Sequence, residues 1–442
     1  MVNLIRGMAL AGTVLGSVAL LAGCQKEEIL QGTRIDPRDV IEGASVPGPE
    51  NVARPISLPK PQANADWPQR AGDAQHLLVN PALGAGVTQV WEAPIGQGDS
   101  YRYRLVAEPV VAAGQVFTLD SRGLVTATAA ANGARIWQAS ITPAGDRADD
   151  ATGSGLAYDG GRLYVTSTYG ELVALDARTG AVIWRQRFDA GIGGAPTVAD
   201  GVVYVVARDA SAWAIQTSDG KVLWQLDAAP APAGMGGASA PVVAGRAVIF
   251  PFATGEMLAA MRQGGIGLWQ ANVAGRRVGR GYSQVQDLTG EPVVAGNVVY
   301  AGSSAGKLSA FDLDSGTMLW TAQSGPTSPV QVAGGALFMT TDDAKLQRLD
   351  AATGRVIWSV DLPQYVREKI KKQNEIWVNY GPVLAGGRLF VPSSDGVLRV
   401  FDPVNGALVS QGVIPSGAST DPVVAGGTLY LVSRDGVLRA YR

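Results

Sequence analysis

A unit of about 45 residues recurs along this chain of 442 residues, and this repeat constrains the fold more than any other feature. Its consensus is Pro-Val-Val-Ala-Gly-Gly-x-Leu-Tyr, a second apolar run after a turn, and then Ala-x-Asp-x-x-Thr-Gly-x-x-x-Trp. Three apolar runs separated by turn signals, followed by a fourth that ends in tryptophan, predict a four-stranded antiparallel sheet. Eight copies begin near Pro109, Gly160, Pro196, Pro241, Pro292, Pro329, Pro382 and Pro422.

A tryptophan closes most copies, four residues after the glycine of the last turn. A side chain that recurs once per unit can bury its face between neighbouring sheets, where a large apolar group contributes roughly 1.5–3 kcal/mol. In the seventh copy Gly406 is followed by Ser410 instead, so this copy departs from the consensus. The repeat tryptophans, including one in a strand ahead of the first copy, are Trp91, Trp137, Trp184, Trp224, Trp269, Trp320 and Trp358.

The two ends of the repeat region complete each other. The eighth copy stops at Tyr441-Arg442, before any strand that ends in tryptophan, while residues 87–91 form such a strand without a copy of its own. A ring closed by its own terminal strands leaves no frayed sheet edge. We therefore predict an all-β fold, an eight-bladed β-propeller of four-stranded antiparallel blades closed by pairing of the N- and C-terminal strands.

The N-terminus has the pattern of a secretory signal, with Arg6 ahead of a short apolar stretch, residues 8–21. That stretch is too short to span a membrane, and it runs into Leu-Ala-Gly-Cys at residues 21–24. This motif resembles the lipobox of bacterial lipoproteins, which implies cleavage after residue 23 and a lipid on Cys24, the only cysteine of the chain. The alternative is an ordinary signal peptide followed by a chance cysteine.

We divide the chain into a signal peptide at 1–23, a lipidated cysteine with a flexible, proline-bearing tether at 24–66, and the propeller at 67–442. Gln25 follows the cysteine, and by resemblance to enterobacterial sorting this favours the outer membrane. We expect the protein to be anchored there by its lipid and to face the periplasm.

The residues predict no catalytic residue, no metal site and no cofactor, and hence a protein that is not an enzyme. A net charge of −2 without a basic patch argues against a nucleic-acid partner. The single histidine, His76, is interpreted as a loop residue and cannot form a His-based triad or a two-His metal site. The carboxylates of the repeats occupy equivalent turn positions, where local hydrogen bonding explains them.

Three connections between repeat strands are unusually long. The first runs over residues 228–239 around Met235, and the second over 271–290 with Arg280, Tyr282 and Asp287. The third, an insertion at residues 361–380, carries a basic run that predicts a short amphipathic turn.

The repeats resemble the pyrroloquinoline-quinone-like repeat shared by quinoprotein dehydrogenases and a group of propeller lipoproteins. With its lipobox, tether, length and eight blades, the chain most resembles the BamB family of the outer-membrane β-barrel assembly machinery. The resemblance implies a non-enzymatic scaffold that docks onto the POTRA region of BamA and assists the folding and insertion of outer-membrane proteins. Unfolded outer-membrane proteins are implied as further partners.

By the same resemblance, the loops before Pro241 and Pro292 are the docking loops, with Met235, Arg280, Tyr282 and Asp287 as partner-binding residues. The chain departs from the family pattern at Gly236, where an arginine is expected, and at Thr289, where a second acid is expected.

Two other functions remain open at this point. A periplasmic dehydrogenase dependent on pyrroloquinoline quinone is the main alternative, although a single cysteine cannot form the disulfide of many such enzymes. The other is a propeller that binds peptides by strand addition to its blade edges.

Overall fold

The computed structural model describes residues 51–77, 80–84, 86–231, 239–273, 275, 285–303 and 305–442. Cys24, Met235, Arg280 and Tyr282 lie outside the described residues, whereas Asp287 and the seven repeat tryptophans lie within them. Within this part of the chain, no helix is both long and apolar enough to cross a membrane. A short 3-10 turn, η2 (Ile370–Lys372), lies in the insertion.

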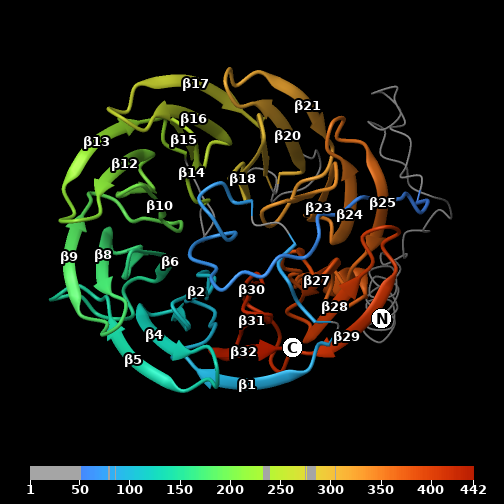
Figure 1. Ribbon diagram of the computed structural model, residues 1–442, viewed down its shortest axis with the longest axis horizontal. Coiled ribbons are helices and arrows are strands. Elements are labelled where there is room, and N and C mark those ends of the chain that lie inside the picture. Colours follow the sequence, from blue (N-terminus) through green and yellow to red (C-terminus); the bar gives the residue numbers. More distant parts are fainter. Residues whose placement is uncertain are drawn as a thin grey trace, which may run out of the picture. The chain divides into compact units, whose positions relative to one another are not determined.

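Eight four-stranded antiparallel sheets stand around a central channel as the blades of a propeller (Figure 1). The first four blades are β2 (Val110–Ala112), β3 (Gln115–Leu119), β4 (Leu124–Ala129), β5 (Arg135–Ser140); β6 (Gly153–Asp159), β7 (Arg162–Ser167), β8 (Glu171–Asp176), β9 (Val182–Arg187); β10 (Thr197–Ala199), β11 (Val202–Val206), β12 (Ser211–Gln216), β13 (Val222–Asp227); and β14 (Val242–Ala244), β15 (Ala247–Pro251), β16 (Glu256–Met261), β17 (Gly267–Asn272). The last four are β18 (Gly290–Ala295), β19 (Val298–Ser303), β20 (Lys307–Asp312), β21 (Met318–Ala322); β22 (Gln331–Ala333), β23 (Ala336–Thr340), β24 (Lys345–Asp350), β25 (Val356–Asp361); β26 (Val383–Ala385), β27 (Arg388–Pro392), β28 (Val397–Phe401), β29 (Leu408–Val413); and β30 (Val423–Ala425), β31 (Thr428–Ser433), β32 (Val437–Tyr441), β1 (Gln89–Pro94).

The ring closes in blade 8, where the first strand of the chain pairs with the last. In Figure 1, β1 lies beside β32. Their register joins Gln89 to Tyr441 and Pro94 to Val437 in an antiparallel ladder. The predicted eight-bladed propeller and its closure by the terminal strands are confirmed.

The repeat tryptophans connect each blade to the next. In each of seven junctions the indole Nε1 donates to a carbonyl oxygen in the following blade, at 2.8–3.3 Å. The ring lies directly on the glycine of the last turn of that blade, where an added Cβ would be 2.4–2.9 Å from the ring. Within one blade, the tryptophan therefore contacts the following blade, and the glycine four residues before it contacts the tryptophan of the preceding blade. The pairs are Trp91/Gly133, Trp137/Gly180, Trp184/Gly220, Trp224/Gly265, Trp269/Gly316, Trp320/Gly354 and Trp358/Gly406.

Ser410 stands at the eighth junction, between blades 7 and 8, and the closure explains its identity. The last turn of blade 8 does not exist, because β32 and β1 are the two ends of the repeat region and Arg442 and Gly86 replace the turn. A tryptophan at position 410 would have no turn glycine to cover. Instead the Tyr441 hydroxyl donates to the carbonyl oxygen of Val413 at 3.2 Å.

A segment that we call the strap, residues 51–77 and 80–84, crosses one end of the channel (Figure 1). Residues 51–66, which the sequence assigned to the tether, make specific contacts with the ring, such as Asn64 N–Hδ2 donating to Val424 O at 2.6 Å. This differs from the expectation of a free tether over these residues. The strap combines backbone hydrogen bonds with single side-chain contacts, and neither repeats at the period of a helix or a strand.

The strap satisfies the inner edges of the blades. The innermost strand of each blade leaves one row of backbone groups unpaired toward the channel, and such groups require partners when they are buried. At one equivalent position in five blades, the backbone N–H donates to the strap at 2.7–3.0 Å. These pairs are Val111 to Trp67, Tyr158 to Pro68, Val198 to the Gln69 side chain, Val243 to Ala74, and Val294 to Gln75.

The tryptophan–glycine contact predicts a measurable difference between two alanine substitutions. Gly220 and Gly161 have similar φ angles of 78° and 82°, but an added Cβ would lie 2.7 Å from Trp184 at the first and meet nothing within 4 Å at the second. Gly161→Ala should cost about 1–2 kcal/mol, because positive φ strains an L residue. Gly220→Ala should cost about 1–3 kcal/mol more, because the indole must move. Chemical denaturation measures both, and equal losses would contradict the proposed junction contact.

Candidate functional site

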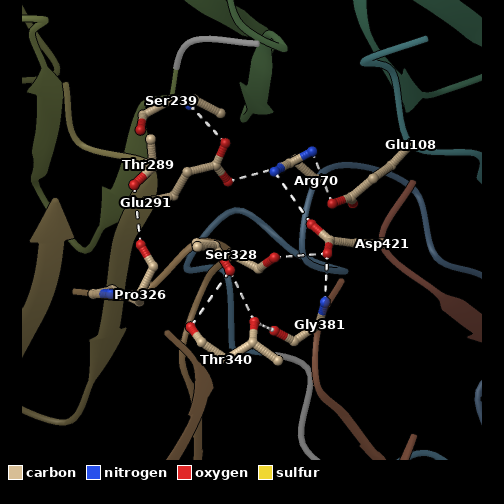
Figure 2. Close-up of polar contacts among 12 residues, drawn as sticks. Arg70, Glu108, Ser239, Thr289, Glu291, Pro326, Ser328, Thr340, Gly381 and Asp421 are labelled. Carbon is tan, nitrogen blue, oxygen red and sulfur yellow. Dashed lines mark hydrogen bonds and ion pairs between the residues drawn. The ribbon is translucent and has the colours of Figure 1, made fainter. Parts of the chain in front are cut away.

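Arg70 of the strap lies at the centre of a buried ionic cluster in the channel (Figure 2). Its guanidinium is 2.8 Å from Glu108 Oε1, 2.9 Å from Glu291 Oε2 and 3.5 Å from Asp421 Oδ2. The three carboxylates come from blades 1, 5 and 8, and the Arg70 side chain is 16% exposed. One residue of the strap thus holds together acids from distant parts of the ring. We call Arg70, Glu108, Glu291 and Asp421 the axial cluster.

The three acids occupy the same place in their repeats. Each directly precedes the proline that opens the innermost part of its blade, in Glu108-Pro109, Glu291-Pro292 and Asp421-Pro422. Rotation around the ring brings this position of every blade toward the axis. The sequence reasoning missed the axial cluster, although acids at one repeat position in three copies were a signal that could have found it.

Further hydrogen bonds extend the cluster to three more blades (Figure 2). Asp421 Oδ1 accepts from the Ser328 hydroxyl at 2.7 Å and from the backbone N–H of Gly381 at 2.6 Å. Glu291 Oε1 accepts from the backbone N–H of Ala240 at 3.2 Å. Blades 4, 6 and 7 are therefore tied to the same carboxylates.

The axial cluster carries one cation and three acids, and its electrostatics favour retention of a proton. Burial raises the pKa of Glu108 well above its usual value, and the neighbouring Asp421 and Glu291 act in the same direction, whereas Arg70 opposes them. For Arg70, burial lowers the pKa, but the three carboxylates outweigh this effect and the net shift is upward. The net effect on Glu108 favours its protonated form, while Arg70 remains charged.

His76, interpreted from the sequence as a loop residue, is a buried part of the strap with 1% exposure. Its Nδ1 lies 2.8 Å from the carbonyl oxygen of Pro292, so the Nδ1–H donates to blade 5. Burial, the largest effect, lowers the pKa of His76. A neutral imidazole therefore helps to fix the strap.

The two predicted docking loops are joined at their bases. The Ser239 hydroxyl donates to the carbonyl oxygen of Leu288, and Ala240 is bonded to Glu291 as described above. Asp287, the predicted partner-binding residue that the structure describes, is 3% exposed at the base of the second loop. The structure therefore brings the bases of the two loops together and places Asp287 at the base of the second loop.

A cavity of about 560 Å³ opens at the channel end opposite the strap. Arg70 and Asp421 lie at its inner end, and its walls include parts of residues 99–106 and of the insertion at 375–380. The strap is bonded to the first turns of blades, for example at Gly386 and Gly426. Because the four strands of a blade alternate in direction, the connections between successive blades lie at the other end. The docking loops and the insertion therefore leave the ring on the same side.

The described residues contain no group of three or more His, Cys, Asp or Glu arranged to hold a metal ion. In the axial cluster, the Arg70 guanidinium is bonded to all three carboxylates. We assign this cluster a structural role, since its polar atoms are satisfied by one another.

The raised pKa of Glu108 predicts a pH-dependent contribution to stability. Because the folded protein holds this proton more tightly, the contribution is fully present below the unfolded value of about 4.5 and is lost as pH rises through the folded pKa. Glu108→Gln mimics the protonated acid. Between pH 5 and pH 8, the free energy of unfolding of the wild type should therefore fall relative to that of the Glu108→Gln variant. Urea unfolding at several pH values measures this difference.

The contribution of His76 to stability has the opposite pH dependence. Because the pKa of His76 is lowered in the folded protein, the free energy of unfolding falls as pH drops below the pKa of histidine in the unfolded chain. Both proteins contain it, so its effect cancels in the difference. Glu368→Gln makes the same chemical change at an exposed position and supplies the baseline. A Glu108→Gln difference that does not vary with pH would count against a raised pKa of Glu108.

Comparison with solved structures shows a likeness in fold to proteins of different activity. BamB from Moraxella catarrhalis is 21% identical with a TM-score of 0.68, and the match covers 80% of this chain and 99% of that one. The quinohemoprotein alcohol dehydrogenase from Comamonas testosteroni is 15% identical with a TM-score of 0.65, covering 85% and 80%. A europium-containing methanol dehydrogenase is 14% identical with a TM-score of 0.65, covering 83% and 89%. At these identities the likeness establishes the propeller fold alone.

Sequence comparison is more specific. The family model described as outer membrane protein assembly factor BamB matches residues 121–360 and 366–442. The BamB of Yersinia pestis is 28% identical over 333 residues, and that of Escherichia coli K12 is 26% identical over 334 residues, each match covering 74% of this chain and 82% of the relative. Because the family match spans most of the sequence, the chain belongs to the BamB family of outer membrane protein assembly factors.

Proposed function

We propose that this protein is a non-enzymatic scaffold lipoprotein of the outer-membrane β-barrel assembly machinery. It docks onto the POTRA region of a BamA-like barrel protein and assists the folding and insertion of outer-membrane proteins. The observation that carries this proposal is the joining of the two docking loops at Ser239–Leu288 and Ala240–Glu291. A rigid ring holds the bases of the two loops beside each other, so that one partner can contact both loops.

Within these loops, Met235 is proposed as the apolar anchor, and Arg280 and Tyr282 are proposed as further partner-binding residues. Apolar and aromatic groups with a neighbouring arginine are the types that dominate binding energy at interfaces. Asp287 is proposed to act from the base of the second loop, since a side chain that is 3% exposed positions its neighbours more readily than it meets a partner.

The anchor is proposed to be a lipid on Cys24, which holds the propeller at the outer membrane on its periplasmic side. Each buried methylene contributes about 0.8 kcal/mol, so more than one acyl chain gives a lasting attachment. The residues between Cys24 and Asn51 then link the lipid to the strap.

The fold likeness to dehydrogenases supports a second candidate, a periplasmic protein dependent on pyrroloquinoline quinone. One of those neighbours contains europium, and hard cations of this kind require oxygen ligands. On the channel axis of this chain, the three described carboxylates are bonded to Arg70. These residues do not fit a quinone with its metal at that place, and the scaffold is the better supported function.

Docking is tested by affinity purification of the full chain from its own envelope in detergent. A BamA-like protein should co-purify with the wild type and fall at least about tenfold in Met235→Glu and in Arg280→Glu, because a buried charge or a reversed charge opposes the interface. Arg178→Glu is the matched control, since Arg178 is exposed on a turn at the strap end of the channel. If the assembly protein is absent from the wild-type sample, or is retained by both loop variants, the docking proposal fails.

The lipid anchor is tested by the Cys24→Ser variant. Without the thiol no acyl chain can be attached, so the variant should move from the membrane fraction to the soluble periplasmic fraction. Incorporation of labelled palmitate into the wild type should also disappear. A Cys24→Ser protein that stays with the outer membrane to the same extent would show that another contact holds it there.

A further inference from the structure

The insertion at residues 361–380 forms a hairpin that extends the rim of the channel. Its two arms are joined by the N–H of Trp377 donating to Gln364 O at 2.8 Å and the N–H of Val366 donating to Glu375 O at 3.1 Å. The second arm continues onto blade 7, where the N–H of Ser394 donates to Val378 O at 2.9 Å. The family match is interrupted at residues 361–365, where this hairpin begins. Backbone hydrogen bonds therefore hold the hairpin in place, and its second arm lines the cavity.

Two arginines elsewhere in the lining of the cavity have donors to spare. Arg104 and Arg434 each approach Asp99 Oδ2 at 3.8 Å, which is too long for a strong hydrogen bond. Asp99 already accepts from the N–H of Leu105 at 2.7 Å and from the Ser419 hydroxyl at 3.1 Å. The arginine side chains are 57% and 42% exposed and line the cavity. A second carboxylate can therefore enter and take the closer contacts.

The rim combines positive charge with exposed apolar groups. Residues 99–106 and 365–380 contain six basic and three acidic side chains, although the whole chain has a net charge of −2. At the tip of the hairpin, Lys371 and Lys372 are exposed. Ile370 is 86% exposed, Ile376 57% and Val378 40%, and Tyr101, within residues 99–106, is fully exposed. Apolar groups exposed together beside a cavity indicate an interaction site.

We propose that this rim, made of residues 99–106, Arg434 and the 365–380 hairpin, binds an acidic, extended polypeptide segment. Carboxylates of the segment pair with Arg104 and Arg434 in the cavity and with the hairpin lysines outside it. Its apolar side chains pack on Ile376 and Val378. This surface is separate from the docking loops and does not depend on the proposed BamA contact.

The shape of the rim favours a polypeptide over other anions. A cavity of about 560 Å³ is in the range that encloses several side chains or a small ligand. A small anion would occupy the arginines and leave the exposed isoleucine and valine without a role. A bilayer surface would meet the hairpin tip but would not fill a concave site. An extended chain with alternating acidic and apolar residues can enter the cavity, pair with the arginines and pack on the exposed isoleucine and valine.

The test measures binding of a fluorescently labelled ten-residue peptide of alternating Glu and Leu to the purified full chain in detergent, by anisotropy. A peptide with Lys in place of Glu is the charge control. We expect the acidic peptide to bind, to weaken as salt rises, and to lose at least about tenfold in affinity with Arg104→Gln/Arg434→Gln. Ile376→Ser/Val378→Ser should weaken binding without removing its salt dependence.

The matched control is Arg178→Gln/Lys221→Gln, which removes two exposed cations at the strap end and should leave binding unchanged. Denaturation midpoints verify that all variants remain folded. The proposal is overturned if the lysine peptide binds equally well, if neither peptide binds, or if the arginine pair has no effect. It is also overturned if vesicles containing phosphatidylglycerol bind through the arginines while the acidic peptide does not. Because no BamA-like protein is present, this result is independent of the outcome for the docking loops.

Discussion

The pairing of β1 with β32 determines how the rest of the molecule is arranged. It converts a row of eight sheets into a ring, and it accounts for the one junction without a tryptophan, because the turn that Ser410 would face is divided between the two chain ends. It also fixes where the chain enters. The start of β1 lies beside Tyr441, at the end of the channel that holds the first turn of each blade, so the residues before β1 must approach from that side. The strap is a consequence of this closure.

The strap in turn makes one end of the channel structural and leaves the other for binding. Its backbone pairs with inner-strand N–H groups of five blades, and Arg70 binds three acids that would otherwise repel one another in a buried place. Removing one partner of a buried ionic group costs about 3–5 kcal/mol, because the remaining charges lose their compensation. Such a cluster therefore holds blades 1, 5 and 8 in register, while the loops at the opposite end are free to differ between blades.

The sequence predicted the features that repeat and missed those that occur once. Gly180 and Trp184 were visible because a glycine followed four residues later by tryptophan recurs in six copies, and residues 87–91 were visible because they match a strand missing from the last copy. Residues 51–66 of the strap were interpreted as tether because they show no apolar periodicity, and their contacts with the ring, such as Asn64 with Val424 O, leave no repeated residue pattern. Arg70 could not be paired from sequence alone, since its three acids lie 38 to 351 positions away and their meeting requires the ring to exist. The basic turn in the insertion was predicted, but the wall that the hairpin builds was not, because it depends on the backbone contact of Val378 with Ser394.

The same propeller supports enzymes and assembly factors, so the content of the channel matters more for function than the fold does. In this chain the axis is filled by a guanidinium and the carboxylates that bind it, and a side chain anchored in the strap cannot leave without opening contacts to several blades. A reaction at the channel axis would require Arg70 and its carboxylates to move apart. Recognition at the open end does not require this, because Arg104 and the 365–380 hairpin lie on connections between blades and Arg434 lies in the turn between β31 and β32, all in or beside the cavity. Variation there changes which partner is bound and leaves the ring intact, which is the physical basis for treating the insertion as a gain of binding surface.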